Sequence, residues 1–205
     1  MEDPQPSLST RKLKLNVTMG LYSLMAAFSL IWGFYRDRPN VWFHPEPLFE
    51  AAWPVTVTLG LGAGIALGLG ISLLSVWLAR RARWARTLMS EFRSLLGGLT
   101  ARDILLIASL SSVGEELFFR GVLLPGLGHV LGSQWLGLVA SSLIFGLLHV
   151  PASRRMIPWM LQAVTMGFVL GFLYLFTGDL TVCVATHFVI NHRNLMIIQT
   201  WEDPS

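Results

Sequence analysis

Three short motifs place polar side chains that could do chemistry at fixed spacings within apolar sequence. The first is the run EELFFR at 115–120, in which two acidic residues precede an arginine. The second ends at His149, four residues after Phe145, and the third joins His187 to Asn191 at the same spacing. A charged side chain at the centre of a bilayer costs about 2.5–3.5 kcal/mol, so ionisable groups in apolar segments indicate function.

The two glutamates of the first motif are predicted to have different tasks. In an α-helix, Glu116 and Arg120 lie four residues apart, share one face and can form an ion pair. Glu115 is rotated away from that face and is left as the free carboxylate. A carboxylate in apolar surroundings suits a general base or acid near neutral pH. The alternative is that both acids only hold helices together.

His187 and Asn191 are expected to stack two hydrogen-bonding side chains on one helix face. Such a pair could donate hydrogen bonds to an oxyanion. The alternative is that the two side chains link neighbouring helices. His149 taken alone, near a helix end, is more typical of an interfacial or hydrogen-bonded residue than of a catalyst. Cys183 lies in an apolar segment and is interpreted as a small buried side chain.

The composition indicates a membrane protein. Apolar residues make up 53% of the 205 residues and charged residues only 13%, against about 25% charged residues in soluble proteins. A soluble chain so poor in charge could not cover its surface, and twelve Phe and eight Trp exclude intrinsic disorder. The net charge of +3 comes without a dense basic run, so we expect no nucleic-acid partner. A single cysteine excludes an internal disulfide.

Six apolar segments are expected to cross the lipid bilayer as helices, each crossing needing roughly 20 residues. The predicted fold class is therefore all-α, a polytopic transmembrane bundle of about six helices. The first segment follows basic residues but lacks a small-residue cleavage site, so it is interpreted as an uncleaved helix. The segments are 16–35, 53–79, 104–124, 135–150, 156–177 and 180–199.

The basic residues set the predicted orientation. If both termini are cytoplasmic, eleven of the fifteen basic residues lie on the inner side, and only Arg36 and Arg38 lie in outer loops. The N- and C-termini are therefore predicted to be cytoplasmic. Segment 80–103, the main inner loop, is either an interfacial amphipathic helix or a solvated loop. Glycines at every fourth residue predict close helix packing; they are Gly60, Gly64, Gly68, Gly167 and Gly171.

Two of the candidate residues are expected at different depths. Glu115 follows Asp103 by twelve residues, roughly 18 Å along a helix. His149 precedes Arg154 by only five residues, near the same inner face. The two can share a site only if the inner helix boundaries differ from those expected or if the helices bend around a water-filled cavity, which hydrolysis at that depth would need.

Together and in this order, the three motifs resemble those of a known family. Glu-Glu-x-x-x-Arg at 115–120, Phe-x-x-x-His at 145–149 and His-x-x-x-Asn at 187–191 are similar to the motifs of the CAAX protease and bacteriocin-processing (CPBP, or Abi) family of intramembrane endopeptidases. The resemblance covers about 104–199. It divides one membrane domain into two N-terminal helices with a basic loop, 1–103, and a CAAX-protease-like catalytic core of four helices, 104–199.

The resemblance implies a peptide hydrolase. Glu115 would activate a water molecule, and His149 would orient that water or share its proton. His187 and Asn191 would stabilise the tetrahedral oxyanion. The supporting side chains would be Glu116, Arg120 and Phe145.

The family resemblance leaves metal dependence as an alternative. Members are often labelled metalloproteases, and a set of Glu115, His149 and His187 could hold zinc with an open fourth position. The chain has no H-E-x-x-H motif, and a water activated by glutamate needs no metal. We therefore expect no cofactor.

The implied partner is a membrane-anchored protein or peptide substrate. Candidates are a C-terminal anchor or sorting segment, as in the myxosortase-like members, a bacteriocin leader, or a prenylated CAAX tail. The short chain indicates a bacterial member, located in the inner (cytoplasmic) membrane, and favours the first two. The alternatives from other classes are a non-catalytic membrane immunity or binding protein and a proton-coupled transporter. The lack of a detectable repeat argues against a transporter, and the sequence does not indicate an oligomeric state.

Overall fold

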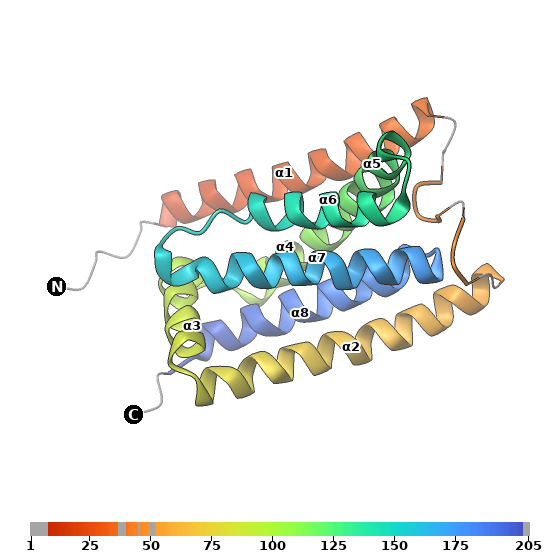
Figure 1. Cartoon of the computed structure of the whole chain (residues 1–205). Coiled ribbons are helices and arrows are strands. Elements are labelled where there is room, and N and C mark those ends of the chain that lie inside the picture. Colours follow the sequence, from red (N-terminus) through yellow and green to blue (C-terminus); the bar gives the residue numbers. More distant parts are fainter. Residues whose placement is uncertain (1–7, 37–39, 45, 50–51, 203–205) are drawn as a thin grey trace.

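The computed structural model describes residues 8–36, 40–44, 46–49 and 52–202, and these are almost entirely helical. The long helices lie side by side along one direction, and α3 crosses one end of the bundle (Figure 1). The all-α prediction is confirmed. The elements are α1 (Leu8–Tyr35), α2 (Trp53–Arg81), α3 (Arg83–Leu96), α4 (Ala101–Glu116), the π-helix η1 (Leu117–Leu123), α5 (Leu124–Leu131), α6 (Gln134–Leu148), the 3-10 helix η2 (Arg154–Met156), α7 (Ile157–Thr177) and α8 (Leu180–Thr200).

All six expected segments are helical, but fewer pass a test of length and apolarity for crossing a membrane. In the described part of the chain, Leu15–Tyr35, Trp53–Arg81 and Arg154–Thr177 pass, and a fourth span is added if α3 and Ala101–Leu131, bent by 108°, count as one. Helix α6 has only 15 residues, and α8 carries several polar side chains. The criterion thus gives three to four crossings where six were predicted.

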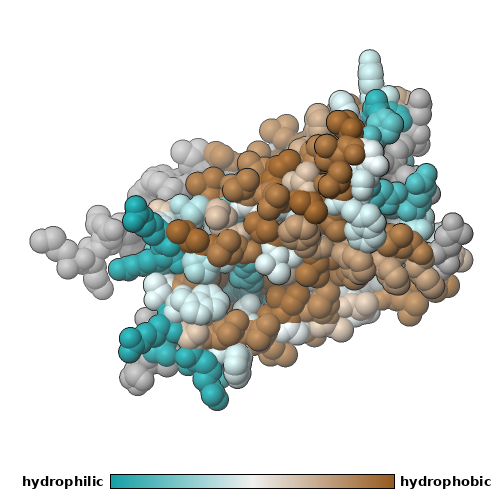
Figure 2. All heavy atoms as spheres, in the orientation of Figure 1, coloured by the Kyte–Doolittle hydropathy of each residue, from teal (hydrophilic) through white to brown (hydrophobic). Residues whose placement is uncertain are grey.

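The surface agrees with a multi-pass membrane protein. On the face shown in Figure 2, apolar residues form a broad belt around the middle of the bundle, and hydrophilic residues gather towards its two ends. Long apolar side chains such as Leu24, Leu59 and Leu147 are more than half exposed. Outward-facing apolar side chains of this kind suit contact with lipid tails rather than with water.

Helices α2 and α8 are held close by the predicted glycine stripe. A Cβ atom added to Gly64 would lie 2.7 Å from the Ala185 Cβ, and one added to Gly68 would lie 2.8 Å from the Thr186 carbonyl oxygen. Small residues allow this backbone approach where no water drives helices together. The packing role predicted for these glycines is confirmed, and it fixes the helix that carries His187.

Helices α6 and α7 use the second stripe in the same way. A Cβ atom at Gly167 would meet the Ser142 Cα at 2.9 Å, and one at Gly171 would meet the Leu138 Cδ1 at 2.4 Å. Close packing of this pair brings the end of α6, and with it His149, against the start of α7.

Segment 80–103 was predicted to be either an amphipathic helix or a solvated loop. The structure contains the amphipathic helix α3 in this segment. Ala85, Leu88 and Met89 are buried against the bundle, while Trp84 and Leu95 are about half exposed. The start of α1, the end of α8 and α3 all lie at one end of the bundle (Figure 1). We call this end, which carries the arginines of α3, the basic end of the molecule. An amphipathic helix across it is suited to lie at a membrane interface.

Helix α4 begins at a complete capping box. The Thr100 hydroxyl accepts from the Asp103 backbone N–H, and the Asp103 carboxylate accepts from the Thr100 backbone N–H. The cap satisfies orphan donors at the helix start and fixes where α4 turns away from α3. From this start, α4 runs to Glu116 and passes directly into η1.

Candidate active site

All four candidate catalytic residues line one cavity of about 240 Å³. Glu115 comes from α4, His149 from the end of α6, and His187 and Asn191 from α8. The wall is completed by apolar side chains, including Phe92 of α3. The cavity joins residues that the sequence places at different depths, because α3 closes the bundle end beside His149 while α4 reaches the interior.

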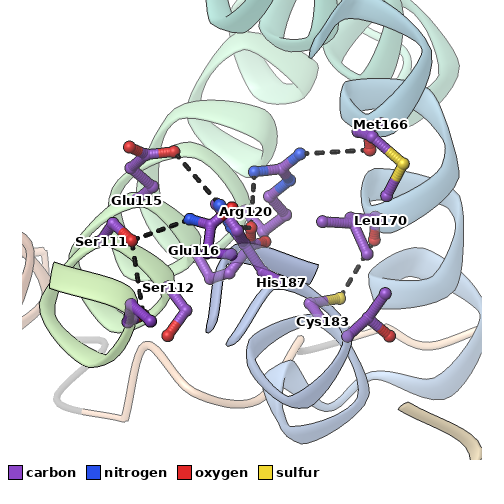
Figure 3. A network of polar contacts seen from close by, with 12 residues as sticks. Ser111, Ser112, Glu115, Glu116, Arg120, Met166, Leu170, Cys183 and His187 are labelled. Atoms are coloured by element: carbon purple, nitrogen blue, oxygen red, sulfur yellow. Dashed lines mark hydrogen bonds and ion pairs between the residues drawn. The ribbon is translucent and has the colours of Figure 1, made fainter. Parts of the chain in front are cut away.

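Glu116 is the centre of the polar network (Figure 3). Its side chain is fully buried, and its Oε1 atom accepts hydrogen bonds from Arg120 Nη1 at 2.9 Å and from His187 Nδ1 at 2.8 Å. The ion pair expected from the i, i+4 spacing is therefore present. The contact with His187 joins α4 to α8 and was not expected. A buried carboxylate held by two cationic or hydrogen-bonding partners is stable where a lone one would not be.

Arg120 is held on three sides. Besides Glu116, its Nη2 atom donates to the Met166 carbonyl oxygen at 3.4 Å on α7. Its guanidinium carbon lies 4.5 Å from the ring centroid of Phe145, which is a cation–π distance. Arg120 is only 2% exposed. The three supporting residues named from the sequence are thus in contact with one another.

The π-helix η1, a wide helical turn, affects the directions in which the side chains of Glu116 and Arg120 point. A π-helix inserts one extra residue into a helical turn, and such turns often occur at functional sites. Here α4 ends at Glu116 and η1 includes Arg120. The i, i+4 ion pair therefore spans the boundary between the two helix types. Amino-acid periodicity gave no sign of the wide turn.

Glu115 faces the cavity with a less satisfied carboxylate. The residue is 6% exposed, and its Oε2 atom lies 3.8 Å from His187 Nε2. That oxygen, like the Oε2 atom of Glu116, has no hydrogen-bond partner among the described residues. Tyr22 of α1 lines the same cavity. The division between a paired Glu116 and a freer Glu115 matches the expectation from their helical positions.

His187 has a defined proton on one ring nitrogen. A carboxylate oxygen accepts, so the Nδ1 atom that contacts Glu116 carries a hydrogen. The neutral ring therefore presents a lone pair at Nε2 towards Glu115 and the cavity. Nε2 becomes a donor only when the imidazole is protonated. Donation to an oxyanion by His187 thus depends on its protonation.

His149 is fixed by the end of its own helix. Its Nδ1 atom lies 2.7 Å from the Phe145 carbonyl oxygen, and a carbonyl only accepts, so Nδ1 carries the hydrogen. The ring is packed between Phe145, at 4.5 Å, and Trp159, at 5.1 Å. In the neutral ring, Nε2 is left as the acceptor. This arrangement suits a residue that orients water or accepts a proton.

Asn191 makes a contact that the motif did not indicate. Its Nδ2 atom donates to the Ser111 hydroxyl at 3.0 Å, which links α8 to α4. The amide has a second N–H, and the side chain lines the cavity. The interhelical link considered as an alternative is therefore present, and it leaves one amide hydrogen for another acceptor.

The described residues do not form a metal centre of the usual kind. In the described ranges, no group of three or more His, Cys, Asp or Glu side chains is arranged to hold a metal ion. The Nδ1 atoms of His149 and His187 are directed to Phe145 and Glu116. Each ring therefore has only its Nε2 atom left for another partner.

The cavity also contains residues that the motifs did not identify. Tyr22 reaches it from α1, Phe92 from α3, and Trp159 and Gln162 from α7. Ser111 joins them through Asn191. No spacing rule connects these positions to the motifs, because they are spread over four helices, α1, α3, α4 and α7. The one available signal was a tryptophan close in sequence to His149.

Comparisons with known proteins agree with this site. Residues 98–192, which contain all three motifs, match the family model described as type II CAAX prenyl endopeptidase Rce1-like. The uncharacterized protein YpbD of Bacillus subtilis (strain 168) is 34% identical over 90 residues, which are 43% of this chain and 41% of that protein. The chain thus covers about two fifths of the length of that relative. No solved structure matches this chain. Over residues 98–192 the chain is thus similar to the type II CAAX prenyl endopeptidases of the Rce1-like family.

Proposed function

We propose that the protein is an intramembrane endopeptidase that hydrolyses a peptide bond in a membrane-anchored protein or peptide. The observation that carries this proposal is the cavity lined by Glu115, His149, His187 and Asn191, in which Glu116 is occupied by Arg120 and His187 while Glu115 is not. The match to a prenyl endopeptidase family supports the same class of reaction.

The reaction begins with a water molecule beside Glu115. The carboxylate accepts a proton from the water, and the oxygen atom of that water attacks the carbonyl carbon of the peptide bond. The Nε2 acceptor of His149 orients the same water from the other side of the cavity. The tetrahedral intermediate collapses when the C–N bond breaks and the proton held by Glu115 passes to the leaving amine. No proton is gained or lost overall.

The oxyanion formed during attack needs hydrogen-bond donors. The second N–H of Asn191 is one donor, and Nε2–H of a protonated His187 is the other. Placed donors of this kind act in a cavity with little water, where they are strong. Glu116 and Arg120 support the site, because the contact of Glu116 with Nδ1 fixes the ring of His187.

The substrate is proposed to be a membrane-anchored chain, such as a C-terminal anchor or sorting segment or a leader peptide. The cavity is lined largely by apolar side chains, among them Phe92, Leu96 and Ile198 near the basic end of the bundle. Such a wall suits an extended apolar segment that enters from the membrane or from its interface. A location in the bacterial inner membrane with cytoplasmic termini is part of the same proposal.

The test compares protein termini in the membrane. A strain lacking the gene is complemented with the wild type, with Glu115→Gln or with Glu202→Gln, which changes an exposed carboxylate near the C-terminus. We expect the wild type and Glu202→Gln to restore the same new termini and Glu115→Gln to restore none, at equal amounts of protein in the membrane. If Glu115→Gln restores the termini, Glu115 is not the general base.

The same comparison decides between a protease and a binding protein. If the strain lacking the gene and the wild type have identical termini, the protein does not cleave membrane proteins, and an immunity or binding role takes its place. If purified, active protein loses stoichiometric zinc together with its activity on chelation, the metal-free mechanism is wrong.

A further inference from the structure

Helix α1 lies outside the family match, yet it reaches the candidate site. The match begins at residue 98, whereas Tyr22 of α1 is part of the cavity wall. Tyr22 is half-buried between Leu21, 56% exposed, and Leu24, 69% exposed. The tyrosine is therefore the residue of this turn that faces inward, while its neighbours face outward.

The backbone of α1 touches α4 next to Glu115. A Cβ atom added to Gly114 would lie 2.6 Å from the Tyr22 carbonyl oxygen. Glycine at this position lets α1 approach, and the residue that follows it is Glu115. The side chains of Tyr22 and Glu115 line the same cavity. The two helices thus approach each other next to a cavity wall to which both side chains contribute.

We propose that Tyr22 is a positioning residue for the general base, and that its hydroxyl donates a hydrogen bond to the Glu115 carboxylate. This inference rests on the proposed function. Tyr22 holds the carboxylate from α1, and His187 Nε2 lies on its other side at 3.8 Å. With two neighbours from different helices, the carboxylate is directed at the water between them rather than free to rotate.

A hydrogen-bond donor favours the ionised form of a carboxylate, so removal of the donor makes protonation easier. The proposed contact can therefore be tested by replacing Tyr22. Three other titratable side chains line the cavity with Glu115: Tyr22 of α1, His149 just after α6 and His187 of α8. Glu116 is paired with Arg120 and with His187 Nδ1. Only the change at Tyr22 removes a donor without changing any formal charge near neutral pH.

A spectroscopic test needs no substrate. Infrared spectra of the purified full-length protein in detergent are recorded across a pH titration, and the carbonyl stretch of the protonated Glu115 carboxyl is assigned by its loss in Glu115→Gln. We expect this band to appear at higher pH in Tyr22→Phe than in the wild type. The control Tyr35→Phe makes the same change on the same helix at an exposed position and should leave the band unchanged.

A kinetic test uses a precursor identified by the comparison of termini. Tyr22→Phe should lower kcat about tenfold, the effect of one hydrogen bond to a charged group, with KM changed less than twofold. The acidic limb of its rate profile should move to higher pH. Gly114→Ala should also lower kcat, by moving α1 away from α4, whereas Gly20→Ala, which meets nothing within 4 Å, should not.

The outcomes separate the inference from the proposed function. If the wild type cleaves and Tyr22→Phe leaves the infrared titration, kcat and the pH profile as they are, Tyr22 does not position Glu115. If the infrared titration shifts but no protein is cleaved by the wild type, the contact between Tyr22 and Glu115 is real and the proposed peptidase activity is wrong.

Discussion

Two adjacent glutamates differ because different helices surround them. Glu116 faces the ion pair and the histidine ring inside the bundle, and Glu115 faces the cavity. The part of this difference that is local, the i, i+4 pair of Glu116 with Arg120, follows from helical geometry and could be predicted. The contacts of His187 with Glu116 and of Asn191 with Ser111 could not, because they depend on how α4 and α8 pack.

Removal of the buried charge of Glu116 should strongly destabilise the protein. Glu116→Gln leaves the buried Arg120 without its ionic partner, which costs about 3–5 kcal/mol in comparable buried pairs. Glu91→Gln is the matched control, because its partner Arg155 is 72% exposed and exposed pairs contribute about 0–1 kcal/mol. Thermal unfolding in detergent, followed by circular dichroism, measures both changes. Equal stability of the two variants would contradict a structural role for Glu116.

Asn191 and Ser111 should have unequal effects on cleavage. Asn191→Ala removes the proposed oxyanion donor and should lower kcat by about 10²–10³. Ser111→Ala removes only the acceptor that orients the amide and should lower kcat by about tenfold or less. Steady-state kinetics on one precursor gives both values. A larger loss with Ser111→Ala than with Asn191→Ala would show that the amide itself does not contact the reacting atoms.

The arrangement of the helices depends on the glycine stripes, on the π-helix η1 and on the crossing helix α3. The glycine stripes of α2 and α7 were readable from the sequence, because their four-residue period needs no knowledge of the partner. The π-helix and the crossing of α3 over the bundle end were not, because both result from tertiary contacts. The Glu91 carboxylate of α3 accepts from the Ser153 hydroxyl at 3.2 Å and from Arg155 at 3.3 Å. These contacts tie α3 to the loop that follows His149.

The contact of α2 with α8 should be sensitive to one methyl group. Gly64→Ala places a Cβ atom 2.7 Å from both the Ala185 Cβ and the Val182 carbonyl oxygen, and overpacking of this kind costs about 1–3 kcal/mol. Gly62→Ala has nothing within 4 Å and should be neutral or slightly stabilising. The melting temperatures of the two variants in detergent provide the comparison. A melting temperature of Gly64→Ala as high as that of Gly62→Ala would mean that α2 is free to shift.

The molecule as a whole has a basic end and an opposite end, and we predict its membrane orientation from them. Residues 40–44 and 46–49 lie at the opposite end, where backbone N–H groups of His44 and Leu48 donate to the carbonyls of Gly178 and Leu175. Composition was enough to predict a helical membrane protein. The number of crossings was harder to predict, because α6 is short and α8 is polar, so both depend on burial by neighbours rather than on their own apolarity.

Labelling with a membrane-impermeant maleimide tests the orientation. Cys183 is buried and is removed by Cys183→Ala. In that background, Asn40→Cys lies at an exposed position of the segment opposite α3, and Ser94→Cys at an exposed position of α3. We expect Asn40→Cys to react in intact cells and Ser94→Cys only after permeabilisation. The reverse pattern would invert the topology, and reaction of both in intact cells would contradict a membrane-spanning bundle.

The wide turn η1 means that the chain carries one residue more than an α-helix needs between α4 and α5. Deletion of a residue such as Val122 would restore regular α-helical hydrogen bonding, because the wide turn takes up the extra residue. It would also change the directions of side chains within η1, among them Arg120, relative to Glu116. Natural variation in this segment is therefore expected to conserve length more strictly than amino-acid identity, so a single gap here would mark a chain whose site is built differently.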